Sequence, residues 1–163
     1  AELSADEICT LTLASYEADA KAYQQATAHR EREADHALFF RYLALAFPTT
    51  AAYDLLDVGC GPGRDLARFR ALGHRAVGLD GCPSFVAMAR AASAGLVLHQ
   101  DLRRLQLVPS SFDGIFASAS LFHLPQTALP TTLESLARAL RPRGVLCTLN
   151  PRGADRTGFS GDR

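Results

Sequence analysis

The residues of this chain best suited to chemistry begin with three glycines at alternate positions, Gly59, Gly61 and Gly63. They follow an apolar run that contains Asp57, and a helix-forming pattern resumes at Asp65. Glycine lacks a Cβ atom, so such a loop can turn sharply at positive φ and let a ligand lie against its backbone. The free N–H groups at the start of the following helix favour the polar end of that ligand. The stretch therefore predicts a strand, a glycine loop and a helix that bind a nucleotide-like cofactor.

The spacing of these glycines distinguishes between cofactors. A dinucleotide-binding loop places its third glycine three residues after the second, and in this chain that position is Arg64. An NAD-dependent oxidoreductase is therefore disfavoured, although it stays an alternative. A structural turn without any ligand is the other alternative, since glycine commonly marks turns.

An acid at the end of the next apolar run strengthens the cofactor interpretation. Asp80 lies 23 residues after Asp57, which is the length of one strand-helix-strand unit. A carboxylate at the tip of a second parallel strand can accept hydrogen bonds from both hydroxyls of a ribose. The alternative is that Asp80 caps the helix that starts near Pro83, because acids favour helix N-termini.

His123 is the candidate catalytic base. It follows the fourth expected strand in the stretch Ser118-Ala119-Ser120-Leu121-Phe122-His123. Imidazole exchanges a proton near neutral pH, which suits acid–base work. The alternative is a loop histidine that hydrogen-bonds to backbone.

For the other four histidines we expect structural roles and no chemical one. We expect His29 and His36 to lie on a solvated surface, His74 to interact with a helix C-terminus, and His99 to lie at the edge of the core. No acid or cysteine stands at a spacing that would complete a metal site with them.

Composition places the chain among ordinary globular proteins. Its 163 residues are 48% hydrophobic and 21% charged, with a formal net charge of zero, which argues against a nucleic-acid partner. The four cysteines have no C-x-x-C spacing and are interpreted as unpaired thiols of a reducing compartment. The sequence shows neither a signal-peptide pattern nor an apolar run long enough to span a bilayer. We therefore expect a cytoplasmic protein without a membrane partner.

The elements that must position these residues alternate between helix and strand. Two N-terminal helices, at 4–26 and 30–47, precede strands at 53–58, 75–80, 96–100, 112–118 and 145–150, with helices at 64–72, 83–94 and 130–140 between them. Alternation of apolar strands with helices predicts a three-layer α/β fold with a doubly wound parallel sheet in the order 3-2-1-4-5. The chain is expected to form one domain over 1–163, with a helical cap at 1–50, an α/β core at 51–150 and a polar tail at 151–163. Ligands bind such sheets beyond the carboxyl ends of the strands.

Residues 53–150 resemble a class I S-adenosylmethionine (SAM)-dependent methyltransferase of the small free-standing type. The stretches that carry the resemblance are Leu55–Gly63, Val77–Asp80, Gln100–Leu102, Phe112–Ser118 and Leu140–Leu146. The resemblance implies methyl transfer from SAM to a small-molecule acceptor, with S-adenosylhomocysteine (SAH) as product, and a helical cap around Tyr16 and Tyr23. It also implies a set of cofactor-binding residues, with the adenine beside the third strand and the methionine part beside the fourth: Asp57, Gly59, Cys60, Gly61, Gly63, Arg64, Asp80, Gly81, Asp101, Leu102, Ala117 and Ser118.

The chain departs from the family's pattern in two places. The turn into the fifth strand normally carries two adjacent glycines, and Arg143 replaces the first, so we expect Gly144 to take the positive φ. The family also adds a helix and two antiparallel strands after the fifth strand, whereas residues 151–163 show no strand pattern. The fifth strand is then expected to be an unprotected sheet edge, which invites self-association. A non-catalytic SAM-binding partner subunit stays an alternative for the same reason.

Overall fold

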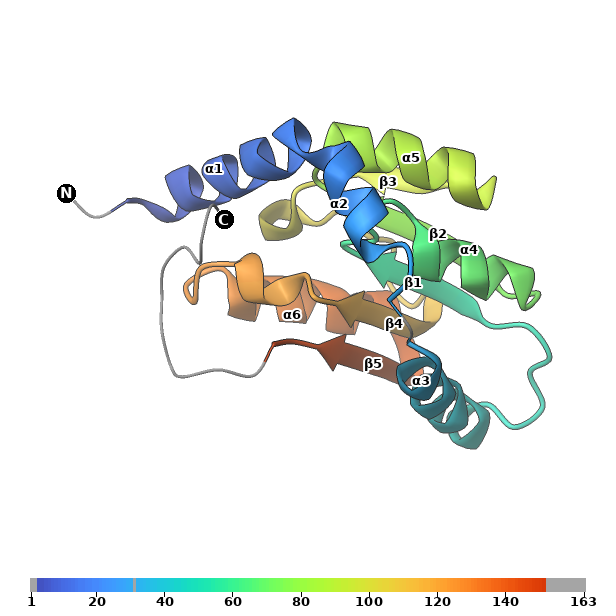
Figure 1. The fold of residues 1–163 in the computed structure, drawn as a ribbon. Helices are drawn as coiled ribbons and strands as arrows, with labels where there is room; N and C mark the ends of the chain where they lie inside the picture. The colour runs from blue at the N-terminus through green and yellow to red at the C-terminus, as the bar shows by residue number, and fades with distance from the viewer. Residues whose placement is uncertain (1–2, 31, 152–163) are drawn as a thin grey trace.

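The computed structural model describes residues 3–30 and 32–151, and its centre is a parallel sheet of five strands. The strands lie in the order β3-β2-β1-β4-β5, and every neighbouring pair runs parallel. The predicted fold class and strand order are therefore confirmed (Figure 1). The bounds are β1 (Asp54–Val58), β2 (Arg75–Asp80), β3 (Val97–His99), β4 (Phe112–Ser118) and β5 (Leu140–Leu149).

Helices cover both faces of this sheet. On one face lie α3 (Glu33–Ala46), α4 (Arg64–Ala71) and α5 (Pro83–Ser93), and on the other lies α6 (Leu129–Ala139). Successive strand residues point to opposite faces, so Leu55 packs in the first core and Leu56 in the second, both fully buried. The central strands β1 and β4 are thus buried on both sides, as the apolar runs predicted.

The N-terminal segment forms two helices where the sequence predicted one. α1 (Ala5–Ala18) begins with a capping box between Ser4 and Glu7, and α2 (Ala20–Thr27) follows directly. The break lies at Asp19, whose φ and ψ of −115° and 19° are not helical. Aspartate is a weak helix former. The bend lets Tyr16 and Tyr23 converge on one another, with ring centroids 5.3 Å apart.

The turn expected before residue 145 lies within β5, which begins at Leu140, and its backbone corrects one expectation. Arg143, not Gly144, takes the positive φ, at 70°. Gly144 is needed for space instead, because a Cβ atom there would lie 2.8 Å from the carbonyl oxygen of Arg141 and 2.9 Å from Leu140 Cδ2. The arginine therefore adopts a conformation that L-residues with side chains rarely take.

β5 is an edge strand among the described residues, where it pairs only with β4. Its inward side chains Val145, Cys147 and Leu149 pack against the core beneath α3. The predicted polar tail lies outside the described residues from position 152 onward. No helix among the described residues is long and apolar enough to cross a membrane.

Candidate active site

The glycine loop between β1 and α4 has the positive φ values that the sequence predicted. They are 66° at Gly59, 53° at Gly61 and 90° at Gly63. A Cβ atom at Gly59 would lie 2.3 Å from Ser120 Cβ, and one at Gly63 would lie 2.6 Å from Ala89 Cα. At Gly61 the nearest atom would be Tyr23 Cε1, at 3.9 Å. Gly59 and Gly63 thus permit close packing, whereas Gly61 leaves an open surface on the loop where a ligand can approach the backbone.

Asp80 ties this loop to the start of α5. Its Oδ2 accepts the Gly61 N–H at 2.8 Å, and its Oδ1 accepts the Cys82 N–H at 2.9 Å. Burial raises the pKa of this carboxyl, although the backbone hydrogen bonds act in the opposite direction. Each carboxylate oxygen can accept a further hydrogen bond, so these contacts leave room for the ribose role predicted for Asp80.

Asp57 lies under the loop and is 2% exposed. Burial, and then the neighbouring charges of Asp65 and Asp80, raise the pKa of its carboxyl well above the ordinary value. Its Oδ2 has no hydrogen-bond partner among the described residues. The carboxyl therefore lies close to the loop but lines neither of the cavities described next.

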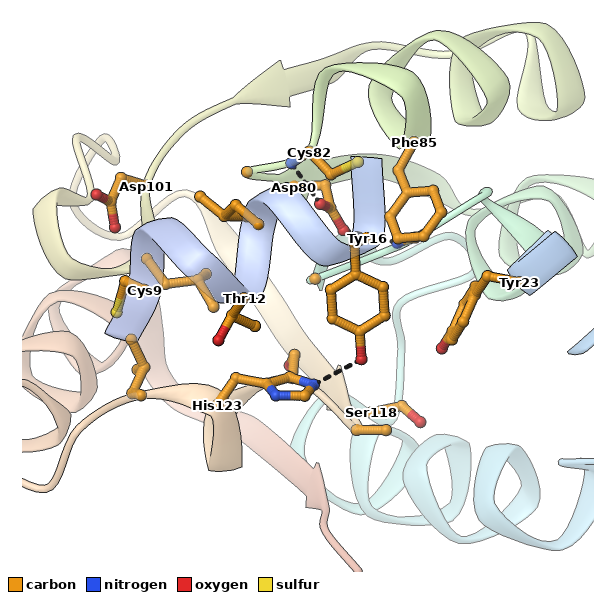
Figure 2. Close-up of a pocket in the computed structure, with 18 residues that line it drawn as sticks. Cys9, Thr12, Tyr16, Tyr23, Asp80, Cys82, Phe85, Asp101, Ser118 and His123 are labelled. Atoms are coloured by element: carbon orange, nitrogen blue, oxygen red, sulfur yellow. Dashed lines mark hydrogen bonds between the residues drawn. The ribbon is translucent and has the colours of Figure 1, made fainter. Parts of the chain in front are cut away.

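A pocket of about 110 Å³ lies between α1 and the carboxyl ends of the strands, and we call it the aromatic pocket (Figure 2). Tyr16, Tyr23 and Phe85 meet there, with the ring of Phe85 5.6 Å from Tyr16 and 5.2 Å from Tyr23. The pocket brings together eight of the predicted site residues, from the carboxyl ends of four strands and the loops that follow them: Gly59, Gly61, Asp80, Gly81, Asp101, Leu102, Ser118 and His123.

His123 faces this pocket from η2 (Leu121–His123), a single helical turn after β4. Its Nε2 lies 2.9 Å from the Oη of Tyr16 on α1, and the two rings meet edge to face (Figure 2). Which of the two atoms donates depends on the histidine tautomer. The contact joins the cap to the loop after β4 across the pocket, so the orientation of His123 depends on α1.

Asp101 faces the pocket beside Leu102, the first residue of η1 (Leu102–Arg104). Although burial disfavours its charged form, hydrogen bonds from Arg103 hold the pKa of Asp101 below the ordinary value. The Arg103 guanidinium also forms an ion pair with Asp6 on α1. Asp101 is therefore ionised at neutral pH and indirectly linked to the cap.

α1 is held over the pocket by a third contact. Glu17 accepts hydrogen bonds from the Ser84 N–H at 3.0 Å and from Cys82 Sγ at 3.0 Å, and also from the Ser84 hydroxyl. These bonds lower the pKa of Glu17. The helix is thus fixed at its start by Asp6 and near its end by Tyr16 and Glu17.

A second cavity, of about 260 Å³, adjoins the first across the glycine loop. It shares Gly59, Gly61 and Ser118 with the aromatic pocket and adds the predicted residues Cys60 and Arg64. Because three further side chains of its lining are arginine or aspartate, we call it the arginine cavity; they are Arg30, Arg32 and Asp65. Gly63 and Ala117, also predicted site residues, line neither cavity.

Two histidine expectations, those for His36 and His99, are wrong. His36 is largely buried and lies 3.2 Å from Asp65 Oδ1, with its ring against Phe69 and Phe116. His99 is exposed, and its Nε2 lies 3.0 Å from the carbonyl oxygen of Gly81. The backbone N–H of His74 donates to the carbonyl oxygen of Phe69 in the last turn of α4 at 3.1 Å, while its ring accepts the Tyr53 N–H and stacks on Phe40. His29 is exposed, as predicted.

Sequence reasoning also missed part of the lining of both cavities. Cys9, Thr12 and Leu13 line the aromatic pocket because they share the face of α1 that carries Tyr16, a face that helical spacing alone could have indicated. Arg30 and Arg32 gave no signal, since they lie between two helices without a motif. The described residues contain no cluster of histidine, cysteine, aspartate or glutamate that could hold a metal ion.

Comparisons with known proteins agree with this geometry. Residues 56–148 match the family described as a methyltransferase domain. A trans-aconitate 2-methyltransferase of Azoarcus sp. (strain BH72) is 36% identical over 117 residues, which cover 71% of this chain and 46% of that protein. The chain thus spans less than half the length of this curated relative.

Solved structures of methyltransferases share the fold. An amino pentose methyltransferase from Micromonospora echinaspora, solved with bound SAM, has a TM-score of 0.68 at 27% identity, and the match covers 83% of this chain and 58% of that one. The 1,6-didemethyltoxoflavin-N1-methyltransferase of Burkholderia thailandensis, solved with bound SAH, has a TM-score of 0.70 at 20% identity, with 87% and 62% covered. The second likeness, at this identity, concerns the fold alone.

Proposed function

The chain belongs to the class I SAM-dependent methyltransferase family, and from this premise we propose that it transfers the methyl group of SAM to a small-molecule acceptor. The observation that carries the proposal is the convergence of Gly61, Asp80, Asp101 and Ser118 on one pocket beneath α1. Sequence spacing singled out Gly61 and Asp80, and the family resemblance singled out Asp101 and Ser118, independently of the structure.

The residues proposed to hold the cofactor have groups that suit its ribose and its adenine. The open surface at Gly61 allows close approach to backbone. Asp80 has acceptor capacity for ribose hydroxyls, and the ionised Asp101 can accept hydrogen bonds from an adenine amino group. Tyr23 and Phe85 provide apolar surface around them. The full proposed set keeps the predicted residues: Asp57, Gly59, Cys60, Gly61, Gly63, Arg64, Asp80, Gly81, Asp101, Leu102, Ala117 and Ser118.

The chemistry asked of the protein itself is modest. When bound, SAM supplies a methyl group already activated on a sulfonium sulfur. The chain must hold the acceptor in line with that group and exclude water, tasks that suit the aromatic pocket and the helix above it. We propose that His123 accepts the acceptor's proton, with Tyr16 fixing the orientation of its ring.

The acceptor is proposed to be a small molecule because the pocket is small and lined by aromatic and apolar side chains. A relative named for trans-aconitate matches this chain over 117 residues, which makes carboxylic acids the first acceptors to test. Four free thiols support the predicted cytoplasmic location.

Calorimetric titration of the purified chain with SAM, SAH and NAD tests the cofactor assignment. We expect SAM and SAH to bind and NAD not to bind, because Arg64 stands where a dinucleotide loop needs glycine. Tighter binding of NAD would contradict the proposal. SAH release in the presence of SAM and a panel of carboxylic acids tests catalysis, and SAM binding without turnover of any acceptor would favour the non-catalytic subunit.

A further inference from the structure

The lining of the aromatic pocket has a charge pattern that favours a cation. Among the described residues, two carboxyl groups line it, those of Asp80 and Asp101, and no lysine or arginine does. The nearby Arg103 is shared between two carboxylates, those of Asp101 and Asp6, so this end of the pocket keeps a net negative charge. A concave site lined by one sign of charge concentrates ligands of the opposite sign. The pocket therefore attracts a positively charged group more than a neutral one.

Three aromatic rings add a second source of attraction for a cation. Tyr16 on α1, Tyr23 on α2 and Phe85 on α5 all line the pocket, although they come from three different helices (Figure 2). The face of an aromatic ring carries negative charge density, which attracts a cation most strongly where water is excluded. The residue Phe85 is only 4% exposed, and both tyrosines are half-buried. The rings are thus placed where an attraction to a cation is strong.

The rings lie where the reacting end of the cofactor is proposed to bind. A Cβ atom on Gly61 would lie 3.9 Å from Tyr23 Cε1, so a ligand against the Gly61 backbone also lies against the ring of Tyr23. The Oη of Tyr16 lies 2.9 Å from Nε2 of His123, the residue proposed to accept the acceptor's proton. The sulfur that donates the methyl group must lie close to that proton, and therefore close to the ring of Tyr16.

The cofactor and its product differ in charge at this sulfur. SAM has a positively charged sulfonium, and SAH has a neutral thioether with the same adenosine and amino-acid parts. We propose that Tyr16, Tyr23 and Phe85 are specificity-determining residues that select the charged cofactor, so that the chain binds SAM more tightly than SAH through attraction between the sulfonium and the ring faces. This selection deepens the proposed function and rests on it.

The alternative is that the three rings form only an apolar wall, since they also pack against one another. An apolar wall contributes equally to SAM and SAH, so that removing a ring would leave the ratio of the two affinities unchanged. Tyr23 offers a matched pair of variants: Tyr23→Phe keeps the ring and loses the hydroxyl, whereas Tyr23→Leu keeps an apolar side chain and loses the ring. Phe85→Leu is a second ring deletion. Tyr16 is left unchanged because its hydroxyl also contacts His123.

The test measures the affinities of SAM, SAH and sinefungin for the purified wild type and these variants by calorimetry. Sinefungin has a protonated amine in place of the methylsulfonium, so it keeps the positive charge and lacks the methyl group. We expect the wild type and Tyr23→Phe to bind SAM about tenfold more tightly than SAH. Tyr23→Leu and Phe85→Leu should each lower this ratio about fivefold, mainly by weakening SAM, and should weaken sinefungin similarly. Thermal melts check that each variant is folded.

Charge selection by the rings is overturned if the wild type binds SAM and SAH equally, or if Tyr23→Leu keeps the wild-type ratio, because the carboxylates alone would then account for the preference. It is also overturned if Tyr23→Leu binds sinefungin as the wild type does, since the ring would then contact the methyl group and not the charge. Should Phe85→Leu fail to fold, the Tyr23 pair decides by itself. A folded wild type that binds neither SAM nor SAH overturns the proposed function as well, whereas equal binding of the two overturns only the charge selection.

Discussion

At the scale of single residues, the site is held together by buried acids. Asp57 and Asp80 lie beside the glycine loop, and burial raises the pKa of both carboxyls. The Asp80 carboxylate accepts hydrogen bonds from the backbone N–H groups of Gly61 and Cys82, which offset the cost of burying its charge. One oxygen of Asp57, by contrast, has no hydrogen-bond partner among the described residues. Asp57 is therefore a group whose ionisation opposes folding of the free protein.

This imbalance predicts that Asp57→Asn stabilises the free protein at neutral pH, by about 1 kcal/mol or roughly 2–4 °C in Tm for a chain of this size. A raised folded-state pKa costs nothing below the unfolded-state value of about 3.9, and its cost grows as pH rises through the folded-state value. The gain in Tm should accordingly be larger at pH 8 than at pH 4.5.

Thermal melts of wild type and variant at both pH values measure this difference, with Glu134→Gln on the exposed face of α6 as the control. A gain that grows toward acid pH would contradict the pKa argument. SAM affinity, measured on the same samples, tests the separate prediction that Asp57 contributes to cofactor binding.

At the scale of elements, one glycine of the loop permits close packing against α5, and another leaves the loop backbone accessible to a ligand. Gly63 lets the loop lie against Ala89 of α5, and Gly61 leaves space in front of the backbone. Both have positive φ, at 90° and 53°, so an alanine at either position carries comparable backbone strain. Their difference lies in what surrounds the added methyl group.

Matched substitutions separate the two roles. Gly63→Ala should lower the free energy of unfolding by about 1–3 kcal/mol more than Gly61→Ala, because its methyl group meets the backbone of α5. Gly61→Ala should instead reduce SAH affinity while leaving most of the stability intact. Denaturant melts and calorimetry on both variants check this, and unchanged SAH binding in folded Gly61→Ala would place the cofactor elsewhere.

The elements that the sequence predicted are those set by local pattern. The parallel sheet with helices on both faces follows from apolar runs that alternate with helices, and Asp80 was identifiable because it ends such a run one unit after Asp57. The bend at Asp19 was not predictable because it depends on a distant contact, the meeting of Tyr16 and Tyr23 with Phe85. The positive φ of Arg143 was missed although the crowding of Gly144 by Arg141 and Leu140 is local, because the sequence does not show how closely that turn is packed. The sequence likewise did not indicate that Arg32 lines a cavity, because that depends on how the surrounding elements pack.

At the scale of the whole molecule, the described sheet has two edge strands, β3 with three residues and β5 with ten. β5 pairs with β4 alone among the described residues, and it is rich in residues that favour strands. Its last residues include the exposed Thr148. An edge of this composition offers unpaired N–H and C=O groups to another chain.

We therefore predict that the 163-residue chain self-associates through β5. Size-exclusion chromatography with light scattering should give a mass above the 17.5 kDa of one chain. Thr148→Lys, which places a charge on the edge, should shift the protein toward monomer. A wild type that is monomeric and melts cooperatively would show that this edge is already covered within the chain.

The three contacts that hold α1 over the pocket also affect the expected rate of product release. The helix is joined to Arg103, to His123 and to the start of α5, and it covers the space where the reaction is proposed to occur. We expect a product beneath it to leave through a local opening that breaks these contacts, so that the residence time of SAH would depend on them. Turnover would then be limited by how fast this helix lifts, and acceptors of very different reactivity would be methylated at similar maximal rates.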